Sequence, residues 1–147
     1  MRISSIEKYG LRCLLALARE GENSQLTIPE IARLEGLSAS YVSKLLSILR
    51  KSGLISSVRG RTGGFRISRP AGQINLLEVL TALGGPLIDP DHCAKSSGQQ
   101  EICIHLSNCS IHHVLAGLAG YVGTFLSHTM LQSILDNEQM DHVQQIE

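Results

Sequence analysis

The sequence has no tryptophan, and aromatic residues make up only 3% of its 147 residues. It also has no apolar run of about 18 residues or more, so we expect no membrane-spanning helix. The first residues lack the apolar stretch and the small-residue cleavage site of a signal peptide. We therefore expect a soluble cytoplasmic protein, in which clustered cysteines more often bind metal or undergo redox chemistry than form structural disulfides.

Positive charge is almost absent from the second half of the chain. Residues 71–147 hold one Lys or Arg against eight Asp and Glu, whereas residues 1–70 hold 12 against five. The net charge of zero therefore hides two halves of opposite sign, and the basic half favours a polyanionic partner such as nucleic acid. The sequence contains no nucleophile–base set and no phosphate-binding loop, so we expect that the protein is not an enzyme.

The basic half has the pattern of a helix-turn-helix. Apolar residues at helical spacing predict a first helix over residues 3–20, with Cys13 as a small buried hydrophobe. Thr27 and Glu30 form a capping box that opens a short second helix, and Ser38 caps a third helix that runs to about residue 52. The third helix has a polar outer face that can donate to base edges and phosphates. A plain helical hairpin is the alternative.

Residues 54–58 and 65–68 predict two short strands joined by a glycine-rich and arginine-rich tip. Such a hairpin is the wing of a winged helix, and its arginines suit a narrow minor groove or phosphates. The sequence thus predicts binding to double-stranded DNA. The candidate DNA-binding residues are Ser38, Ser40, Tyr41, Ser43, Lys44, Arg50, Lys51, Arg59, Arg61, Thr62, Gly63 and Gly64.

A long helix is predicted over residues 110–136, with a length of about 39 Å. Apolar residues recur along it at alternating intervals of three and four, as in a coiled coil, and the pattern continues through Ile134 and Leu135. We expect this helix to form a homodimer, although packing within one chain is the alternative. The candidate dimer residues are Ile111, Leu115, Leu118, Val122, Phe125 and Thr129.

The expected fold class is mainly α, with a winged helix-turn-helix followed by a long dimerisation helix. The expected division is a DNA-binding domain over 1–72, a connecting helix within 73–86, a cysteine-rich loop over 87–109, the dimerisation helix over 110–136 and a disordered tail over 137–147.

The predicted loop holds three of the four cysteines, Cys93, Cys103 and Cys109, and His112 follows them. Thiolates and imidazoles suit zinc or an iron–sulfur cluster. Structural zinc sites usually bring cysteines in close pairs, and none occurs here, which favours a cluster over zinc. Residue types alone leave a cluster and a thiol or disulfide switch nearly equal, with an iron–sulfur carrier or electron-transfer protein as a further alternative. Other candidate ligands are His92, His105 and His113.

Several short motifs resemble the Rrf-two family of bacterial regulators over roughly residues 1–135. They are the opening Met-Arg-Ile-Ser-Ser, then Ser38-Ala-Ser-Tyr-Val, Leu49-Arg-Lys-Ser-Gly-Leu-Ile, Val58-Arg-Gly with Gly-Gly-Phe65, and Asn108-Cys-Ser-Ile-His112. The resemblance implies a homodimeric repressor or activator on a palindromic operator. It also implies an iron–sulfur cluster on Cys93, Cys103 and Cys109 that senses redox state, iron–sulfur status or nitric oxide.

The resemblance also bears on the fourth cluster ligand. In the family's iron–sulfur assembly regulators, a histidine three residues after the last cysteine completes a 2Fe–2S site, and His112 has that place. In its nitric oxide sensors an N-terminal aspartate completes a 4Fe–4S site, and here that position is Lys8. The 2Fe–2S form is therefore favoured, with 4Fe–4S as the alternative. In the assembly regulators a glutamate at the position of Ser43 discriminates between promoter classes. Because this chain has serine there, we do not expect a cluster-dependent change of its DNA sequence preference.

Overall fold

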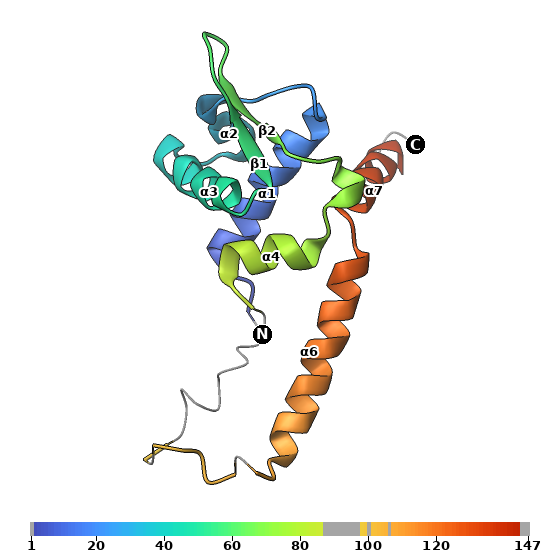
Figure 1. Ribbon diagram of the computed structural model, residues 1–147. Coiled ribbons are helices and arrows are strands. Elements are labelled where there is room, and N and C mark those ends of the chain that lie inside the picture. The colour runs from blue at the N-terminus through green and yellow to red at the C-terminus, as the bar shows by residue number, and fades with distance from the viewer. Residues whose placement is uncertain (1, 87–97, 100, 106, 145–147) are drawn as a thin grey trace.

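The computed structural model describes residues 2–86, 98–99, 101–105 and 107–144 (Figure 1). The described chain is mainly α, with one two-stranded antiparallel sheet. Its elements are α1 (Ser5–Glu20), α2 (Ile28–Glu35), α3 (Ala39–Lys51), β1 (Ile55–Val58), β2 (Gly64–Ile67), the 3-10 helix η1 (Ala71–Gln73), α4 (Leu76–Gly84), α6 (Ser110–His128) and α7 (Leu131–Gln144).

The three N-terminal helices form because each has a strong start signal and one apolar face. Capping boxes open α1 at Ser4 and α2 at Thr27, and Ser38 caps α3. Burying one large apolar side chain stabilises the fold by about 1.5–3 kcal/mol. The helices therefore pack around fully buried side chains, among them Leu14, Leu17, Ile31, Leu45, Leu46 and Leu49.

The wing is joined to the segment that precedes α2. β1 pairs with β2 in antiparallel register, with Ile55 opposite Ile67. Leu26 adds a short bridge to the outer side of β2, because its N–H donates to the Phe65 carbonyl at 3.0 Å and its carbonyl accepts from the Phe65 N–H at 2.8 Å. β2 is therefore hydrogen-bonded along both of its edges, to β1 and to Leu26.

The prediction of one continuous helix over residues 110–136 is wrong. Helix α6 ends at His128, and Thr129 has extended backbone angles. The Leu76 N–H donates to the Thr129 carbonyl and the Leu131 N–H donates to the Ile74 carbonyl, both at 2.9 Å. The helix breaks because these bonds to the start of α4 replace two helical ones, and Leu131 becomes fully buried in the core of its own domain.

The segment predicted as a disordered tail also differs from expectation. Helix α7 continues to Gln144 and packs against η1 and α1. The Arg19 guanidinium donates to both carboxylate oxygens of Glu138 at 2.9 and 2.7 Å, which fixes α7 on α1. Ile134 and Leu135 thus extend the intramolecular core rather than a coiled-coil seam.

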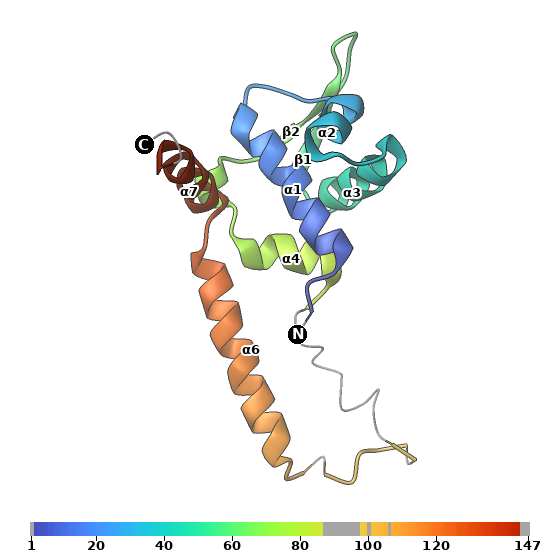
Figure 2. The ribbon, with the colours of Figure 1, turned by 180° about the vertical axis from the view of Figure 1, so that it is seen from behind.

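Helix α6 stands away from the rest of the molecule (Figures 1 and 2). Its C-terminal end packs on α4, and its N-terminal end lies farthest from the winged helix. None of the described helices is long and apolar enough to span a membrane.

Candidate nucleic-acid interface and cysteine site

The outer face of α3 carries small polar side chains and a lysine. Ser40, Ser43 and Lys44 are exposed, whereas the opposite face of the helix is fully buried. The Ser38 hydroxyl accepts from the Tyr41 N–H at 3.3 Å and lies 3.3 Å from the Ser40 hydroxyl, so the first turn is capped. A helix with this face can enter a major groove with its N-terminal residues against base edges.

The turn between α2 and α3 is fixed from α1. Gly36 has a φ of 65°, which places it in the left-handed region at the end of α2. The carboxylate of Glu35, just before this turn, lies 3.4 Å from Arg12 and 3.8 Å from Arg19. Because the Glu35 side chain is only 7% exposed, the two guanidiniums neutralise a carboxylate that is largely removed from water.

Two residues beside α3 are further candidate DNA contacts that the sequence alone did not indicate. The Tyr9 ring lies edge-on to the Tyr41 ring with 6.1 Å between centroids, and the Lys8 ammonium lies 5.2 Å from the Tyr9 centroid. The start of α1 therefore extends the positive surface next to Tyr41. The residue type of Tyr9 alone gives no reason to place it beside the recognition helix.

The tip of the wing presents Arg59, Arg61 and Thr62 to solvent. It projects at the end of the molecule opposite to α6 (Figures 1 and 2). The tip is tight, because the Gly63 N–H donates to the Gly60 carbonyl at 3.1 Å and a Cβ at Gly63 would lie 2.8 Å from the Val58 carbonyl oxygen. Gly64 is half-buried against Leu26, so its missing side chain serves packing within the fold.

The other predicted basic residues, Arg50 and Lys51, are exposed at the C-terminal end of α3. They lie at the opposite end of the helix from Ser38 and Ser40. The structure thus separates the predicted set into a polar start of α3, a basic end of α3 and the wing tip.

Cys109 is the N-cap of α6. Its Sγ accepts a hydrogen bond from the His112 N–H at 3.3 Å. The N-terminus of a helix carries partial positive charge and favours a negatively charged group. A thiolate at this position is a suitable donor for a soft metal centre, and His112 lies one turn farther along the same helix.

The remaining expected ligands are placed only in part. Cys103 lies in the segment that precedes α6, and it is half-buried and not in a disulfide. Cys93 lies outside the described residues. Within the described ranges, no three Cys, His, Asp or Glu side chains come close enough together to hold a metal ion.

Cys13 is separate from this site. It is fully buried in α1. Burial, and secondly the nearby Glu35 carboxylate, raise the pKa of the Cys13 thiol to about 11. Cys13 therefore stays protonated at neutral pH and acts as a small core residue, as expected.

The exposed face of α6 is apolar. Ile111 is 67% and Phe125 65% exposed, and Leu115 and Leu118 also face solvent. Val114 and Tyr121, which the sequence reasoning missed, enlarge this face. A groove of about 500 Å³ runs over it, lined by Gly117, Gly120, Tyr121, Thr124 and Phe125. Val122 is half-buried on α6, whereas Thr129 lies in the break between α6 and α7.

A helix-turn-helix whose polar recognition helix lies beside a basic two-stranded wing defines a winged-helix DNA-binding protein. The comparisons with known proteins assign the family. The chain belongs to the Rrf2 family, because the model of that family, described as an iron-dependent transcriptional regulator, matches residues 3–137. The resemblance seen in the short sequence motifs is therefore confirmed.

Individual relatives agree with this assignment. The chain is 31% identical over 140 residues to the HTH-type transcriptional regulator IscR of Xenorhabdus nematophila, with 95% of this chain and 82% of the relative covered. IscR from T. potens matches with a TM-score of 0.74 at 23% identity, over 94% of this chain and 88% of that one. CymR from Staphylococcus aureus in its oxidized form gives 0.68 at 27% identity, over 91% and 95%.

These relatives are transcriptional regulators and not enzymes, in agreement with the expectation from sequence. The chain is a DNA-binding transcriptional regulator of the Rrf2 family, and the expected fold class, a winged helix-turn-helix that is mainly α, is confirmed.

Proposed function

We propose that the protein is a cytoplasmic homodimeric repressor that binds a palindromic operator and senses redox state, iron–sulfur status or nitric oxide. The sensor is an iron–sulfur cluster, of the 2Fe–2S type in preference to 4Fe–4S, held by Cys93, Cys103, Cys109 and His112. The observation that carries this proposal is the position of Cys109 as the N-cap of α6. A change at this thiol acts directly on the start of the proposed dimer helix.

The geometry of α6 supports the coupling between sensor and DNA. The cysteine-bearing end of α6 lies far from the winged helix of its own chain (Figure 1). When two chains pair along the apolar face of α6, that end can approach the winged helix of the partner. When bound, the cluster supplies a redox-active centre that thiolates and imidazole hold in place.

On the DNA side, the proposed contacts follow from exposure and charge. Ser38, Ser40, Tyr41, Ser43 and Lys44 read the major groove. The wing residues Arg59, Arg61 and Thr62 contact the minor groove or its phosphates. Lys8, Tyr9, Arg50 and Lys51 contact flanking phosphates, and Gly63 and Gly64 shape the wing.

The cluster proposal is tested with protein purified without oxygen. We expect visible absorption, with about two irons and two sulfides per chain for a 2Fe–2S centre. Cys109→Ser is the matched variant, because serine keeps the helix cap while it removes the thiolate. The variant should retain its helical circular dichroism and lose its iron.

Colourless protein with no iron after reconstitution would contradict the cluster. The second candidate is then a thiol or disulfide switch on the same DNA-binding dimer. It is favoured by Cys103 and Cys109, which are partly accessible and not in a disulfide. A disulfide seen by mass spectrometry under oxidising conditions, together with altered DNA binding, would support it.

A further inference from the structure

Arg69 begins the connection between the wing and α4. It follows the last backbone bond of the wing, in which the Ser68 N–H donates to the Leu54 carbonyl at 3.1 Å. Its guanidinium donates to the Glu78 carboxylate at 2.8 Å and to the Gln73 carbonyl at 2.9 Å. One side chain thus holds the base of the wing against η1 and the first turn of α4.

Glu78 connects the Arg69 side chain to the start of α4. Its second carboxylate oxygen accepts from the Asn75 N–H at 2.9 Å, and the Asn75 side chain accepts from the Glu78 N–H at 3.0 Å. The carboxylate therefore belongs to the helix cap and to the ion pair with Arg69 at the same time. Any tilt of the wing base relative to α4 must stretch one of these bonds.

The start of α4 also holds the C-terminal end of α6. Asn75 forms a bridge with Met130, between α6 and α7. The flanking bonds, from the Leu76 N–H to the Thr129 carbonyl and from the Leu131 N–H to the Ile74 carbonyl, are both 2.9 Å long. A continuous set of hydrogen bonds therefore runs from the wing, through Arg69, Glu78 and Asn75, to the end of α6.

We propose that Arg69 is a positioning residue that fixes the orientation of the wing relative to α6 and so sets the half-site spacing that the dimer accepts. This inference rests on the proposed homodimer, in which the two wings are related only through the two α6 helices. A palindrome with altered spacing requires the wings to tilt. The Arg69–Glu78 pair resists that tilt.

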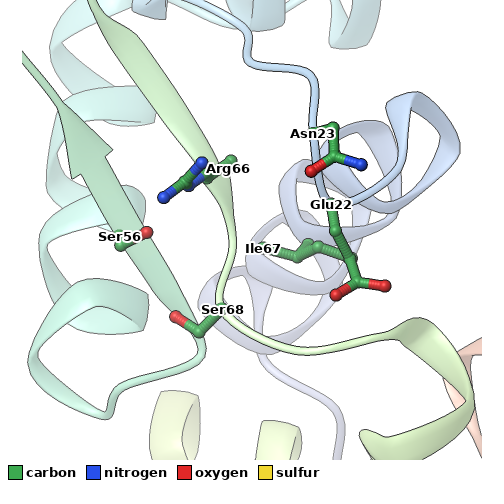
Figure 3. A pocket seen from close by; sticks show the side chains of 6 residues that line it. All are labelled: Glu22, Asn23, Ser56, Arg66, Ile67 and Ser68. Carbon is green, nitrogen blue, oxygen red and sulfur yellow. The ribbon is translucent and has the colours of Figure 1, made fainter.

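The control for Arg69→Gln is a variant that loses the same positive charge at another position. Arg66 lies on β2, one residue before the end of the strand (Figure 3). It stands opposite Ser56, faces a pocket of about 420 Å³ lined also by Glu22 and Asn23, and makes no ion pair with any described residue. Arg66→Gln therefore removes one positive charge without breaking the connection to α6.

The experiment compares three duplexes by fluorescence anisotropy. They carry the palindrome that the wild-type protein selects from a randomised library, the same palindrome with one base pair inserted between its half-sites, and a single half-site. We expect Arg69→Gln to lower the preference for the selected spacing about three- to tenfold, because two half-exposed ion pairs are lost per dimer. Half-site affinity should equal that of Arg66→Gln.

Glu78→Gln gives a second, independent measurement. Glutamine keeps the capping box and removes the charge, so it should lower the spacing preference in the same way. The double variant should lose little more than either single one. Arg69→Lys keeps the charge but loses the guanidinium that donates to both Glu78 and the Gln73 carbonyl. It should therefore retain more of the spacing preference than Arg69→Gln.

The outcomes separate this inference from the proposed dimer. If Arg69→Gln and Arg66→Gln behave alike on all three duplexes, the positioning role is wrong and the dimer stands. If Arg69→Gln weakens every duplex by one common factor, its role is only structural. If the wild-type protein binds both spacings equally, the proposed dimer on a palindrome is wrong, and the positioning role with it.

Discussion

Gly64 is a position where only a hydrogen atom fits. A Cβ there would lie 2.6 Å from the Leu26 carbonyl oxygen, and this backbone atom cannot move without loss of the bridge to Phe65. We predict that Gly64→Ala lowers the free energy of unfolding by about 1–3 kcal/mol, measured by urea denaturation. Gly72→Ala is the control, because a Cβ at Gly72 meets no atom within 4 Å. Equal stability of the two variants would contradict the close approach.

The cysteines should differ sharply in reactivity. In metal-free, reduced protein at about pH 8, iodoacetamide should alkylate Cys103 and Cys109 while the protein is folded. Cys13 should react only after denaturant is added, because it is fully buried and its pKa is raised to about 11. Peptide mass spectrometry measures the three rates. Alkylation of Cys13 at the rate of Cys109 in folded protein would show that the core opens readily.

Local signals in the sequence predict part of the proposed DNA surface, and tertiary contacts add residues that those signals do not mark. Ser38 was found because a cap followed by an apolar stripe is a local pattern. The approach of Tyr9 to Tyr41, with Lys8 behind it, depends on how α1 crosses α3. No spacing along the chain encodes that crossing.

At the scale of elements, α6 presents an apolar face that nothing in the described chain covers. We predict that Leu118→Arg, at a side chain that is 52% exposed, yields a folded monomer. Sedimentation velocity should show dimer formation at least about tenfold weaker, with unchanged circular dichroism. Gln132→Arg, at an exposed position on α7, is the control and should remain dimeric. A Leu118→Arg dimer of wild-type stability would place the interface elsewhere.

The sequence could predict where elements begin better than where they end. The capping box at Thr27 marks the start of α2, the Ser38 cap marks the start of α3, and glycines mark the wing, whereas α1 is predicted from its apolar spacing. The break after His128 has no glycine or proline, and the apolar spacing continues across it through Leu131 and Leu135. Periodicity shows that these leucines are buried, but it does not show whether a second copy or the start of α4 buries them.

At the scale of the whole molecule, the opposite charges of the two halves should govern DNA affinity. If a dimer contacts about 6–10 phosphates, its affinity should fall by about 10³–10⁵ between 50 and 200 mM salt. Arg59→Ala should reduce the slope of log affinity against log salt by about two, measured by anisotropy, because each dimer loses one phosphate contact at each of its two wings. Arg66→Gln should leave the slope unchanged, since Arg66 lines a pocket with Glu22 and Asn23 and pairs with Ser56, away from the wing tip. If Arg59→Ala left the slope unchanged, the wing tip would not contact phosphates through Arg59.

The packing of α7 on α1 also has a consequence for protein synthesis. The ribosome makes β2 roughly 3–13 s before Leu131 follows, at about 5–20 residues per second. During that interval the surface of α1 near Ala18 and Arg19, which later lies against Leu135 and Glu138, has no covering helix from its own chain. A nascent chain that stops between the wing and α7 thus carries a recognition helix on an unfinished core. Such fragments would be early targets for proteases and chaperones.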